Sequence, residues 1–144
     1  MINFLQINLN KAEVAHTELL RRLGEQGETI ALVQEPYRHR GQLARAPRGY
    51  SRIPSAQIEK SRACIFTANS LNLVEFSTLC SADCVAGAMK VNGRQTIFAS
   101  VYLDGTNQEV VTNELRRVVK TAEQKNFGLV IGIDTNSHLS LIHI

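Results

Sequence analysis

The sequence lacks the features that mark several large classes of protein. It has no tryptophan, and its three cysteines (Cys64, Cys80 and Cys84) are an odd number without the paired spacing of a metal site. We therefore expect reduced structural thiols, as in an intracellular protein. No apolar run is long enough to span a membrane. Residues 1–11 have neither a basic leader nor a small-residue cleavage site, so we expect no signal peptide and no membrane partner.

Acidic residues are also missing from residues 37–52. This segment holds five arginines, whereas the rest of the chain holds 11 basic and 13 acidic residues. Positive charge gathered beside two tyrosines is typical of a surface that binds phosphates. The alternative is a solvated loop without a partner. The arginines are Arg38, Arg40, Arg45, Arg48 and Arg52.

What is present is the composition and the pattern of a globular α/β domain. The length of 144 residues predicts one domain with a substantial core. Residues 2–8 and 29–34 are typical of buried strands, and residues 11–25 between them have helical spacing of apolar side chains. This order predicts a βαβ unit with parallel strands. Asn10, three residues before Glu13, is a candidate helix cap.

The second part of the chain changes to short strands. Asn92-Gly93 predicts a tight hairpin between two of them. A second helix is expected at about 108–125, with Thr106 or Asn107 as its cap. The whole pattern predicts an α/β sandwich of mixed strands with helices outside. The expected strands are 62–68, 73–78, 84–91, 95–103 and 127–133.

Polar side chains follow four of the expected strands, at the point where each strand ends. Ligands in α/β sheets bind outside the carboxyl ends of strands, so we expect these side chains to converge on one pocket. Carboxylate and amide oxygens suit Mg²⁺, and a second carboxylate can activate a water for attack on a phosphate. The residues are Asn8, Asn10, Gln34, Glu35, Tyr102, Asp104, Asp134, Asn136 and His138.

Each of these residues also has a purely structural interpretation, and only their joint placement favours a site. The structural interpretations are a helix cap for Asn10, a solvated acid for Glu35, a half-buried core residue for Tyr102, a turn for Asp134 and Asn136, and a structural histidine for His138.

Four motifs stand in a definite order along the chain. They are "LQINLNK" near the start, "LVQEPY" at 32–37, "SVYLD" at 100–104 and "IGIDTNSH" at 131–138. Together they resemble the endonuclease/exonuclease/phosphatase superfamily. They are most similar to the apurinic-type endonuclease domain of non-LTR retrotransposon reverse-transcriptase polyproteins. The resemblance implies a four-layer α/β sandwich of two mixed sheets flanked by helices, with residues 1–138 as a partial domain whose C-terminal half is missing.

The resemblance also implies a role for each matching position. Asn10 stands where related repair enzymes have an acidic metal-site residue, and asparagine keeps the oxygen without the charge, so direct ligation there is the weaker expectation. The implied roles are the active-site floor for Asn8, the divalent metal for Glu35, the scissile phosphate for Tyr102, the nucleophilic water for Asp134 and the position of the phosphate for Asn136.

The chemistry implied by the resemblance is hydrolytic nicking of DNA with Mg²⁺ or Mn²⁺. In such an element the nick supplies the 3′-hydroxyl that primes reverse transcription, by a reverse-transcriptase domain located C-terminally in the same polyprotein. The five arginines would contact DNA phosphates, in a way that salt weakens. We expect no obligate protein partner, and a nuclear location when the enzyme acts on chromosomal DNA.

The end of the sequence departs from the family pattern. The pattern continues through Leu-Trp-Gly to a later aspartate and a Ser-Asp-His segment, whereas residues 139–144 are "LSLIHI". We therefore expect residues 139–144 to be a non-native tail and this chain alone to be inactive or nearly so. The alternatives are another phosphoesterase of the superfamily, a non-catalytic nucleic-acid-binding fragment and an unfolded translation product.

Overall fold

The computed structural model describes residues 2–103, 112–134 and 139–143, the last of these as backbone. The helices are α1 (Glu13–Gln26), α2 (Asn113–Lys125) and two short 3-10 helices, Asn69–Leu71 and Ser77–Leu79. The strands are β1 (Asn3–Asn8), β2 (Thr29–Gln34), β3 (Arg38–His39), β4 (Gln42–Leu43), β5 (Tyr50–Ile53), β6 (Ala63–Ala68), β7 (Val74–Glu75), β8 (Cys84–Val91), β9 (Arg94–Tyr102), β10 (Gly128–Asp134) and β11 (Leu139–His143).

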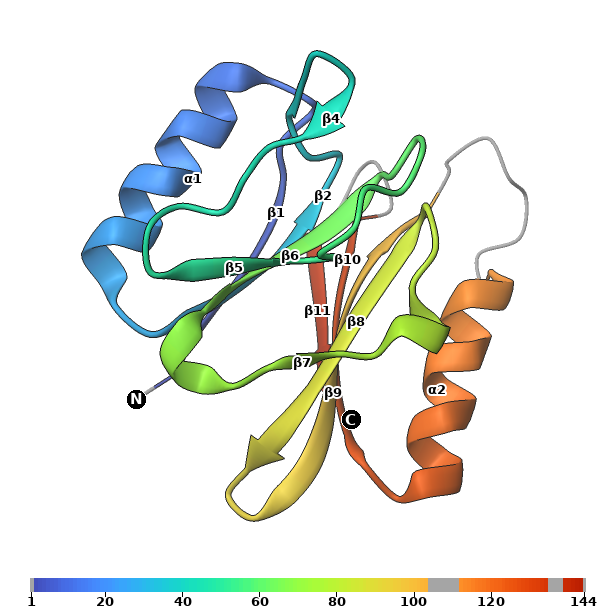
Figure 1. The fold of residues 1–144 in the computed structure, drawn as a ribbon. Coiled ribbons are helices and arrows are strands. Elements are labelled where there is room, and N and C mark those ends of the chain that lie inside the picture. The colour runs from blue at the N-terminus through green and yellow to red at the C-terminus, as the bar shows by residue number, and fades with distance from the viewer. Residues whose placement is uncertain (1, 104–111, 135–138, 144) are drawn as a thin grey trace.

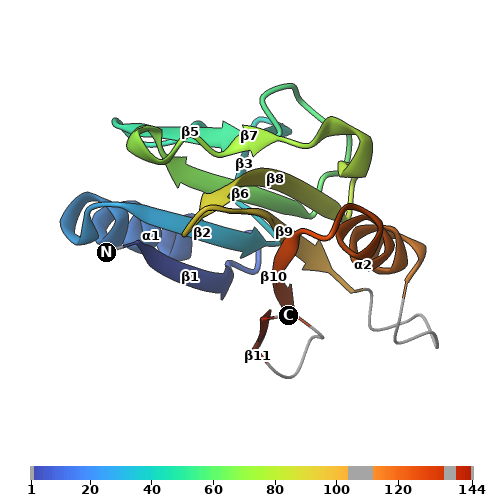
Figure 2. The same cartoon turned by 90° about the horizontal axis from the view of Figure 1, so that it is seen from below.

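Two mixed sheets pack face to face between the helices α1 and α2 (Figure 1). The first sheet has the order β1-β2-β6-β5, and the second has the order β11-β10-β9-β8-β7. Strands β1 and β2 are parallel, as the predicted βαβ unit requires, and so are β9 and β10. Figure 2 shows α1 outside the first sheet and α2 outside the second. The predicted four-layer α/β sandwich is therefore confirmed.

Side chains that alternate along the strands build three layers of core. In β2, Ile30 and Leu32 pack between the sheets, whereas Ala31 and Val33 pack beneath α1. In β9, Phe98 faces the other sheet, while Ile97 packs with α2. Every residue of β2 is buried, as expected for a strand that is covered on both faces. The continuous apolar runs in the sequence thus come from inner strands with a core on each side.

The three cysteines are free. Cys64 lies in the core beneath α1 and Cys84 in the core beneath α2. Burial raises the pKa of both thiols to about 12, so at neutral pH they carry no thiolate. The expectation of structural thiols holds for these two residues.

The start of α1 differs from the expectation. Ala12 occupies the N-cap position without a side-chain hydrogen bond, and the helix begins at Glu13. Asn10 and Lys11 instead have positive φ angles of 50° and 59° and form a turn before the helix. The backbone N–H of Asn10 donates to Asn8 Oδ1 at 2.7 Å. The predicted cap at Asn10 is wrong because this turn directs the residue toward the end of β1.

The start of α2 also lies later than expected. Thr112 is the N-cap, and its hydroxyl oxygen accepts a hydrogen bond from the N–H of Leu115. The caps predicted at Thr106 and Asn107 are therefore wrong, and both residues lie outside the described part of the chain. The second helix itself is confirmed, and its Val118 and Ala122 are buried.

The arginine-rich segment is more ordered than a long loop. It contains the small hairpin of β3 and β4, and β5 forms an edge of the first sheet by pairing with β6. The hydroxyl of Tyr50 donates to the carbonyl of Leu23 at 3.0 Å, at the end of α1. The expected strand at 73–78 is shorter, since only Val74–Glu75 pairs before the chain turns into a 3-10 helix.

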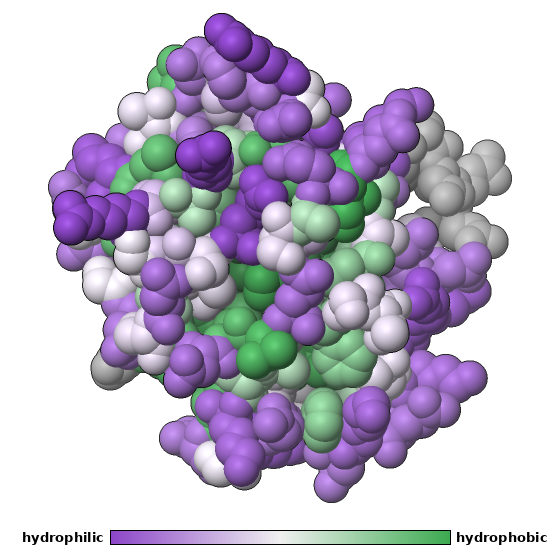
Figure 3. Space-filling model, viewed as in Figure 1, coloured by the Kyte–Doolittle hydropathy of each residue, from purple (hydrophilic) through white to green (hydrophobic). Residues whose placement is uncertain are grey.

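The edge strand β7 contributes to an apolar area on the surface. Hydrophilic residues cover much of the face in Figure 3, and hydrophobic ones gather toward its middle. Val74 of β7 is 66% exposed. At the opposite edge of the same sheet, β11 pairs with β10 in antiparallel register. That residues 139–144 are a non-native tail stays a prediction. Within the described residues, no helix combines the length and apolarity needed to cross a membrane.

Candidate active site

Six strand ends meet at one end of the sandwich, which we call the strand-end edge. The carboxyl ends of β1, β2, β9 and β10 lie there, because each parallel pairing aligns two of these ends and the Asn8–Asp134 contact joins the two sheets at the same edge. Strands β6 and β8 run antiparallel to their neighbours, so their amino ends lie at the same edge. Two side-chain pairs cross between the sheets, Asn8 with Asp134 and Arg62 with Asp83. Glu35 and Tyr102 follow the middle strands, between these two pairs in the strand order.

The Asn8–Asp134 pair joins β1 to β10. Asn8 Nδ2 donates to Asp134 Oδ2, and Asn8 Oδ1 accepts from the Asn10 backbone. Both ends of the amide are thus engaged, which sets its orientation. Asp134 is buried with 6% of its surface exposed. The pair therefore presents a carboxylate in a defined position at the bottom of the edge, as a group that acts on a bound water must be held.

Glu35 follows β2 in a constrained backbone conformation. Its φ angle is 47°, its N–H donates to the carbonyl of Arg62 at 2.9 Å, and its carbonyl accepts from the N–H of Lys11 at 2.9 Å. Positive φ is uncommon for a residue with a side chain, and such residues cluster at functional sites. Among the described residues, no hydrogen-bond or ion-pair partner engages the Glu35 carboxylate.

This free carboxylate is the feature that fits a metal. In phosphate chemistry Mg²⁺ uses one or two carboxylates, completed by waters and by phosphate oxygens. Glu35 could supply one such ligand, and the side chain of Asn10, which precedes the Lys11 that contacts the Glu35 carbonyl, is exposed. The described residues contain no cluster of three or more His, Cys, Asp or Glu side chains.

Tyr102 ends β9 and is the register partner of Asp134 on β10. It is buried, with 8% of its surface exposed. Its N–H donates to the carbonyl of Asp83 at 2.9 Å, and the guanidinium of Arg62 lies over its ring, 4.5 Å from the ring centre. The structure thus places Tyr102 beside the predicted water-activating residue.

The Arg62–Asp83 pair was not predicted from the sequence. Arg62 Nε and Nη2 donate to the two carboxylate oxygens of Asp83 at 2.7 and 2.8 Å. The two residues precede β6 and β8, whereas the strand-end prediction covered only the carboxyl ends of strands. In a mixed sheet, the amino ends of antiparallel strands lie at the same edge. A charged residue directly before an apolar run was the signal that could have indicated the pair.

A buried polar network lies just below the edge and ties the sheets together. Gln34 is fully buried, and its Nε2 donates to Ser100 Oγ at 2.9 Å and to the Gly132 carbonyl at 3.2 Å. Gln6 donates to Gln34 Oε1, and Ser100 donates to the Val33 carbonyl at 2.6 Å. Satisfied networks of this kind fix one arrangement of a core. Gln34 therefore supports the site from beneath.

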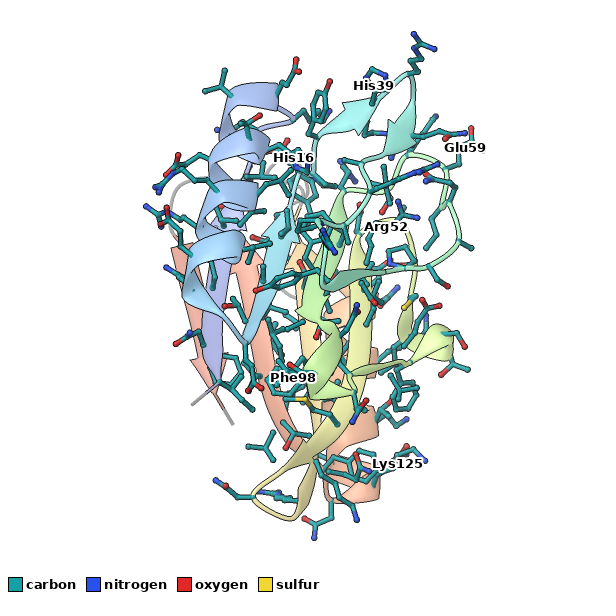
Figure 4. The ribbon with its side chains drawn as sticks, turned by 60° about the vertical axis from the view of Figure 1, so that its left-hand side comes forward. His16, His39, Arg52, Glu59, Phe98 and Lys125 are labelled. Atoms are coloured by element: carbon teal, nitrogen blue, oxygen red, sulfur yellow. The ribbon has the colours of Figure 1, made fainter. Side chains whose placement is uncertain are left out.

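A pocket of about 740 Å³ is lined in part by Lys11, Arg62 and Asp83, each of which contacts Glu35 or Tyr102. Its four cations outnumber its two acids, Glu59 and Asp83, and one of these acids is engaged by Arg62. Figure 4 shows His39 and Glu59 near one end of the molecule and Lys125 at the other. We call the pocket of about 740 Å³ the basic pocket. Its cations are Lys11, Arg38, Lys60 and Arg62.

The five arginines of the basic segment do not form one surface. Arg52 donates to four backbone carbonyls, those of Pro54, Leu43, Ala44 and Ser55, so its guanidinium holds the surrounding loops together. Arg38 reaches the basic pocket and donates to the carbonyls of Ser61 and Gly41. The remaining three, Arg40, Arg45 and Arg48, are exposed. Their predicted contact with DNA stays a prediction.

Some predicted site residues lie outside the described part of the chain. These are Asp104, Asn136 and His138. The described residues bring together Asn8, Asn10, Glu35, Tyr102 and Asp134, from three of the four motifs and the start of the fourth. Their assigned roles stay predictions, although their convergence at one edge agrees with the strand-end argument.

Comparison with known proteins shows the fold. No protein-family profile matches the chain, and no curated protein matches it in sequence. The structure is similar to a solved structure described as the endonuclease domain of TRAS1, a telomere-specific non-LTR retrotransposon. The match covers 94% of this chain with a TM-score of 0.62 and 23% sequence identity. This chain spans 59% of the length of that solved chain. The fold expected from the four motifs is therefore confirmed.

Proposed function

We propose that this chain carries one part of the active site of a Mg²⁺-dependent endonuclease that nicks DNA for a non-LTR retrotransposon. The observation that supports this most strongly is the convergence of the Asn8–Asp134 pair, Glu35 and Tyr102 at one edge of the sandwich. Phosphodiester hydrolysis can use a buried oriented carboxylate to activate water and a second carboxylate to hold a metal, and among the described residues the Glu35 carboxylate has no protein partner.

Each group has a separate task in this proposal. Asp134 orients and deprotonates the attacking water, and Asn8 holds that carboxylate in place through its amide. Tyr102, one strand away, contacts the scissile phosphate, and Asn136 helps to position it. Mg²⁺ (or Mn²⁺) held by Glu35 would polarise the phosphate and stabilise the leaving oxygen. Asn10 can contribute an oxygen but no charge.

DNA is the proposed substrate, and the basic pocket is the proposed route of contact. Lys11 and Lys60 are exposed and carry unpaired charge among the described residues, so they can bind backbone phosphates next to the metal site. The exposed Arg40, Arg45 and Arg48 are further candidates for contact with DNA phosphates. In the parent element, the nick would supply the 3′-hydroxyl primer for a reverse-transcriptase domain in the same polyprotein, acting in the nucleus.

The experiment that tests the enzyme proposal is plasmid nicking. It uses this chain and an extended chain, in which residues 1–138 continue along their genomic reading frame. We expect the extended chain to nick supercoiled plasmid with Mg²⁺ and to stop when EDTA is added. Glu35→Gln should abolish nicking, whereas Glu25→Gln on the exposed face of α1 should leave it unchanged. No nicking by the extended chain would contradict the enzyme proposal.

We also propose that the 144-residue chain alone nicks slowly or not at all. The four motifs do not include the later aspartate and histidine that the resemblance implies for this chemistry. Nicking by this chain at the rate of the extended chain, abolished by Glu35→Gln, would contradict this part of the proposal and leave the enzyme assignment standing.

A second candidate is a non-catalytic nucleic-acid-binding module. The basic pocket favours it, since a positive cavity can bind DNA without any metal. DNA binding that is sensitive to salt, indifferent to EDTA and unchanged by Glu35→Gln, in an extended chain that does not nick, would select this alternative.

A further inference from the structure

We propose that Arg62 is a positioning residue, which fixes Tyr102 and Glu35 relative to each other and is itself held by Asp83. This inference rests on the proposed function, because Tyr102 and Glu35 are the groups proposed to contact the phosphate and the metal. It assigns a role at the same site to two residues that lie outside the four motifs.

The side chain of Arg62 is held by two contacts at once. Both oxygens of Asp83 accept from its guanidinium, at 2.7 and 2.8 Å, so the plane of the group is defined by a two-bond fork. That plane lies over the ring of Tyr102, 4.5 Å from the ring centre. A guanidinium stacks on an aromatic face in this way, and a lysine ammonium has neither the plane nor the fork. The ring of Tyr102 is therefore packed against a group of fixed orientation.

The backbone of Arg62 and Asp83 ties the same contact into the sheets. The carbonyl of Arg62 accepts from the N–H of Glu35 at 2.9 Å, where Glu35 has its positive φ. The N–H of Arg62 donates to the carbonyl of Ala82, and the carbonyl of Asp83 accepts from the N–H of Tyr102 at 2.9 Å. One residue thus contacts the strand end of Glu35 through its backbone and the ring of Tyr102 through its side chain.

The charge balance separates Arg62 from the other cations of the basic pocket. Lys11 and Lys60 have no acidic partner among the described residues, whereas Asp83 engages Arg62 in a bidentate pair. A guanidinium that is already neutralised attracts phosphate less than a free ammonium does. We therefore expect Arg62 to affect the geometry of the site and Lys60 to affect the affinity for DNA.

The test uses ¹⁹F NMR of this chain labelled with 3-fluorotyrosine. The chain has three tyrosines, Tyr37, Tyr50 and Tyr102, whose signals are assigned with single Tyr→Phe variants. Arg62→Lys keeps the charge and removes the fork and the stack, so we expect it to move the Tyr102 signal. Asp83→Asn should move it in the same way. Unchanged Tyr37 and Tyr50 signals show that each variant is folded.

The matched control is Arg38→Lys, the same substitution at another arginine of the basic pocket. Arg38 donates to the carbonyls of Ser61 and Gly41, whereas the fork on Asp83 belongs to Arg62, so the Tyr102 signal should not move. An Arg62→Lys variant whose Tyr102 signal matches that of the parent chain would overturn the inference. So would an equal displacement in Arg38→Lys.

A second measurement separates this inference from the proposed function. A short DNA duplex is added with Ca²⁺ in place of Mg²⁺, and the Tyr102 signal is followed. If the duplex leaves that signal unmoved in the parent chain while Arg62→Lys still moves it, the proposed phosphate contact fails and the positioning role of Arg62 stands.

In the extended chain, Arg62→Lys should slow nicking about tenfold to a hundredfold, the usual loss when a supporting partner of an active-site group is removed. Its KM for DNA should stay within about threefold, because the charge is kept. Arg62→Lys should cost little in a Tyr102→Phe background, since it acts through that ring. The inference would be overturned if the reductions in nicking rate caused by Arg62→Lys and Tyr102→Phe were fully additive. It would also be overturned if Arg62→Lys changed only the KM for DNA.

Discussion

The Asn8–Asp134 and Arg62–Asp83 pairs cross between the same two sheets, yet they differ in chemistry and surroundings. The first is an amide on a carboxylate that is 6% exposed, joining the ends of two strands that run toward the site. The second is an ion pair whose side chains are 34% and 26% exposed, joining the beginnings of two strands that run away from it. Glu35 and Tyr102 lie between the two pairs in the strand order.

This difference indicates that the two pairs have different roles at the strand-end edge. Asn8 donates its amide N–H to the buried carboxylate of Asp134, and an amide carries no charge, whereas Arg62 brings a positive charge to Asp83. A partly exposed ion pair typically contributes about 1 kcal/mol or less to stability, so we assign orientation to Arg62 and Asp83 rather than stabilisation. We therefore expect the first pair to set the chemistry and the second to set geometry.

The largest expected effect distinguishes the two carboxylates directly. In the extended chain, Asp134→Asn should reduce single-turnover nicking by roughly 10²- to 10⁴-fold, the range for loss of a general base. Asp83→Asn should reduce it by only about tenfold to a hundredfold, as a supporting residue does. Plasmid nicking under identical conditions measures both. Equal losses at the two positions would remove the distinction between the pairs.

A smaller effect is expected from moving the sheets apart near the Asn8–Asp134 pair. A Cβ added at Gly132 would lie 2.8 Å from Leu32 Cβ and 2.9 Å from Gln6 Cγ, which belong to the facing sheet. Gly132→Ala should therefore lower the free energy of unfolding by about 1–3 kcal/mol, the usual cost of overpacking. Urea unfolding followed by circular dichroism measures this change.

The control for Gly132→Ala is Gly24→Ala in α1. A Cβ at Gly24 would meet no atom within 4 Å, so alanine there should raise the free energy of unfolding by about 0.5–1 kcal/mol. If Gly132→Ala were as stabilising as Gly24→Ala, the sheets would not be packed as closely beneath the edge as the structure indicates.

The basic pocket beside the Arg62–Asp83 pair should act on binding. We expect Lys60→Ala to weaken DNA binding severalfold and to reduce the slope of log affinity against log salt by about 1, because the variant neutralises one phosphate fewer. Lys90→Ala, on the far part of β8, should change neither quantity. Fluorescence anisotropy at several salt concentrations measures the slopes, and equal slopes for both variants would place the DNA elsewhere.

The smallest expected effect is a loss of folding stability in acid, caused by protonation of His16. Burial lowers the pKa of His16, and Glu13 partly opposes the shift. Since the folded state prefers neutral His16, protonation favours unfolding. The stability contributed by His16 should be complete above about pH 6.5, the ordinary pKa of histidine, and should be lost as the pH falls through its lower folded value.

His16→Leu should remove this part of the pH dependence, whereas His39→Gln, at an exposed position, should keep it. Urea unfolding at pH 7.5 and at pH 5 measures the difference. The ring of His16 packs against Tyr37 and Phe66, on the α1 side of the first sheet. An unchanged pH dependence in His16→Leu would contradict the assignment.

Much of the architecture was predictable because burial on both faces leaves a plain signal. Strands β2 and β8 begin and end where the apolar runs at 29–34 and 84–91 predicted, since every residue of β2 and the first four residues of β8 are buried. The helix starts were not predictable in the same way. Asparagine is a common helix cap, but Asn10 and Lys11 form a turn in which the Asn10 N–H donates to Asn8 Oδ1. This hydrogen bond depends on where β1 ends.

The sequence by itself determined the order of the longer strands and of the helices, the two-sided burial of the inner strands and the polar residues at the ends of β1, β2, β9 and β10. These depend on local spacing and on the chemistry of neighbouring residues. The sequence did not predict the short strands β3, β4 and β5 of the arginine-rich segment. Only the tertiary structure decided that the Arg62–Asp83 pair lies at the same edge and that Arg52 donates to the carbonyls of the surrounding loops. Both outcomes depend on strand direction and on carbonyls distant in sequence, which become neighbours only when the two sheets pack.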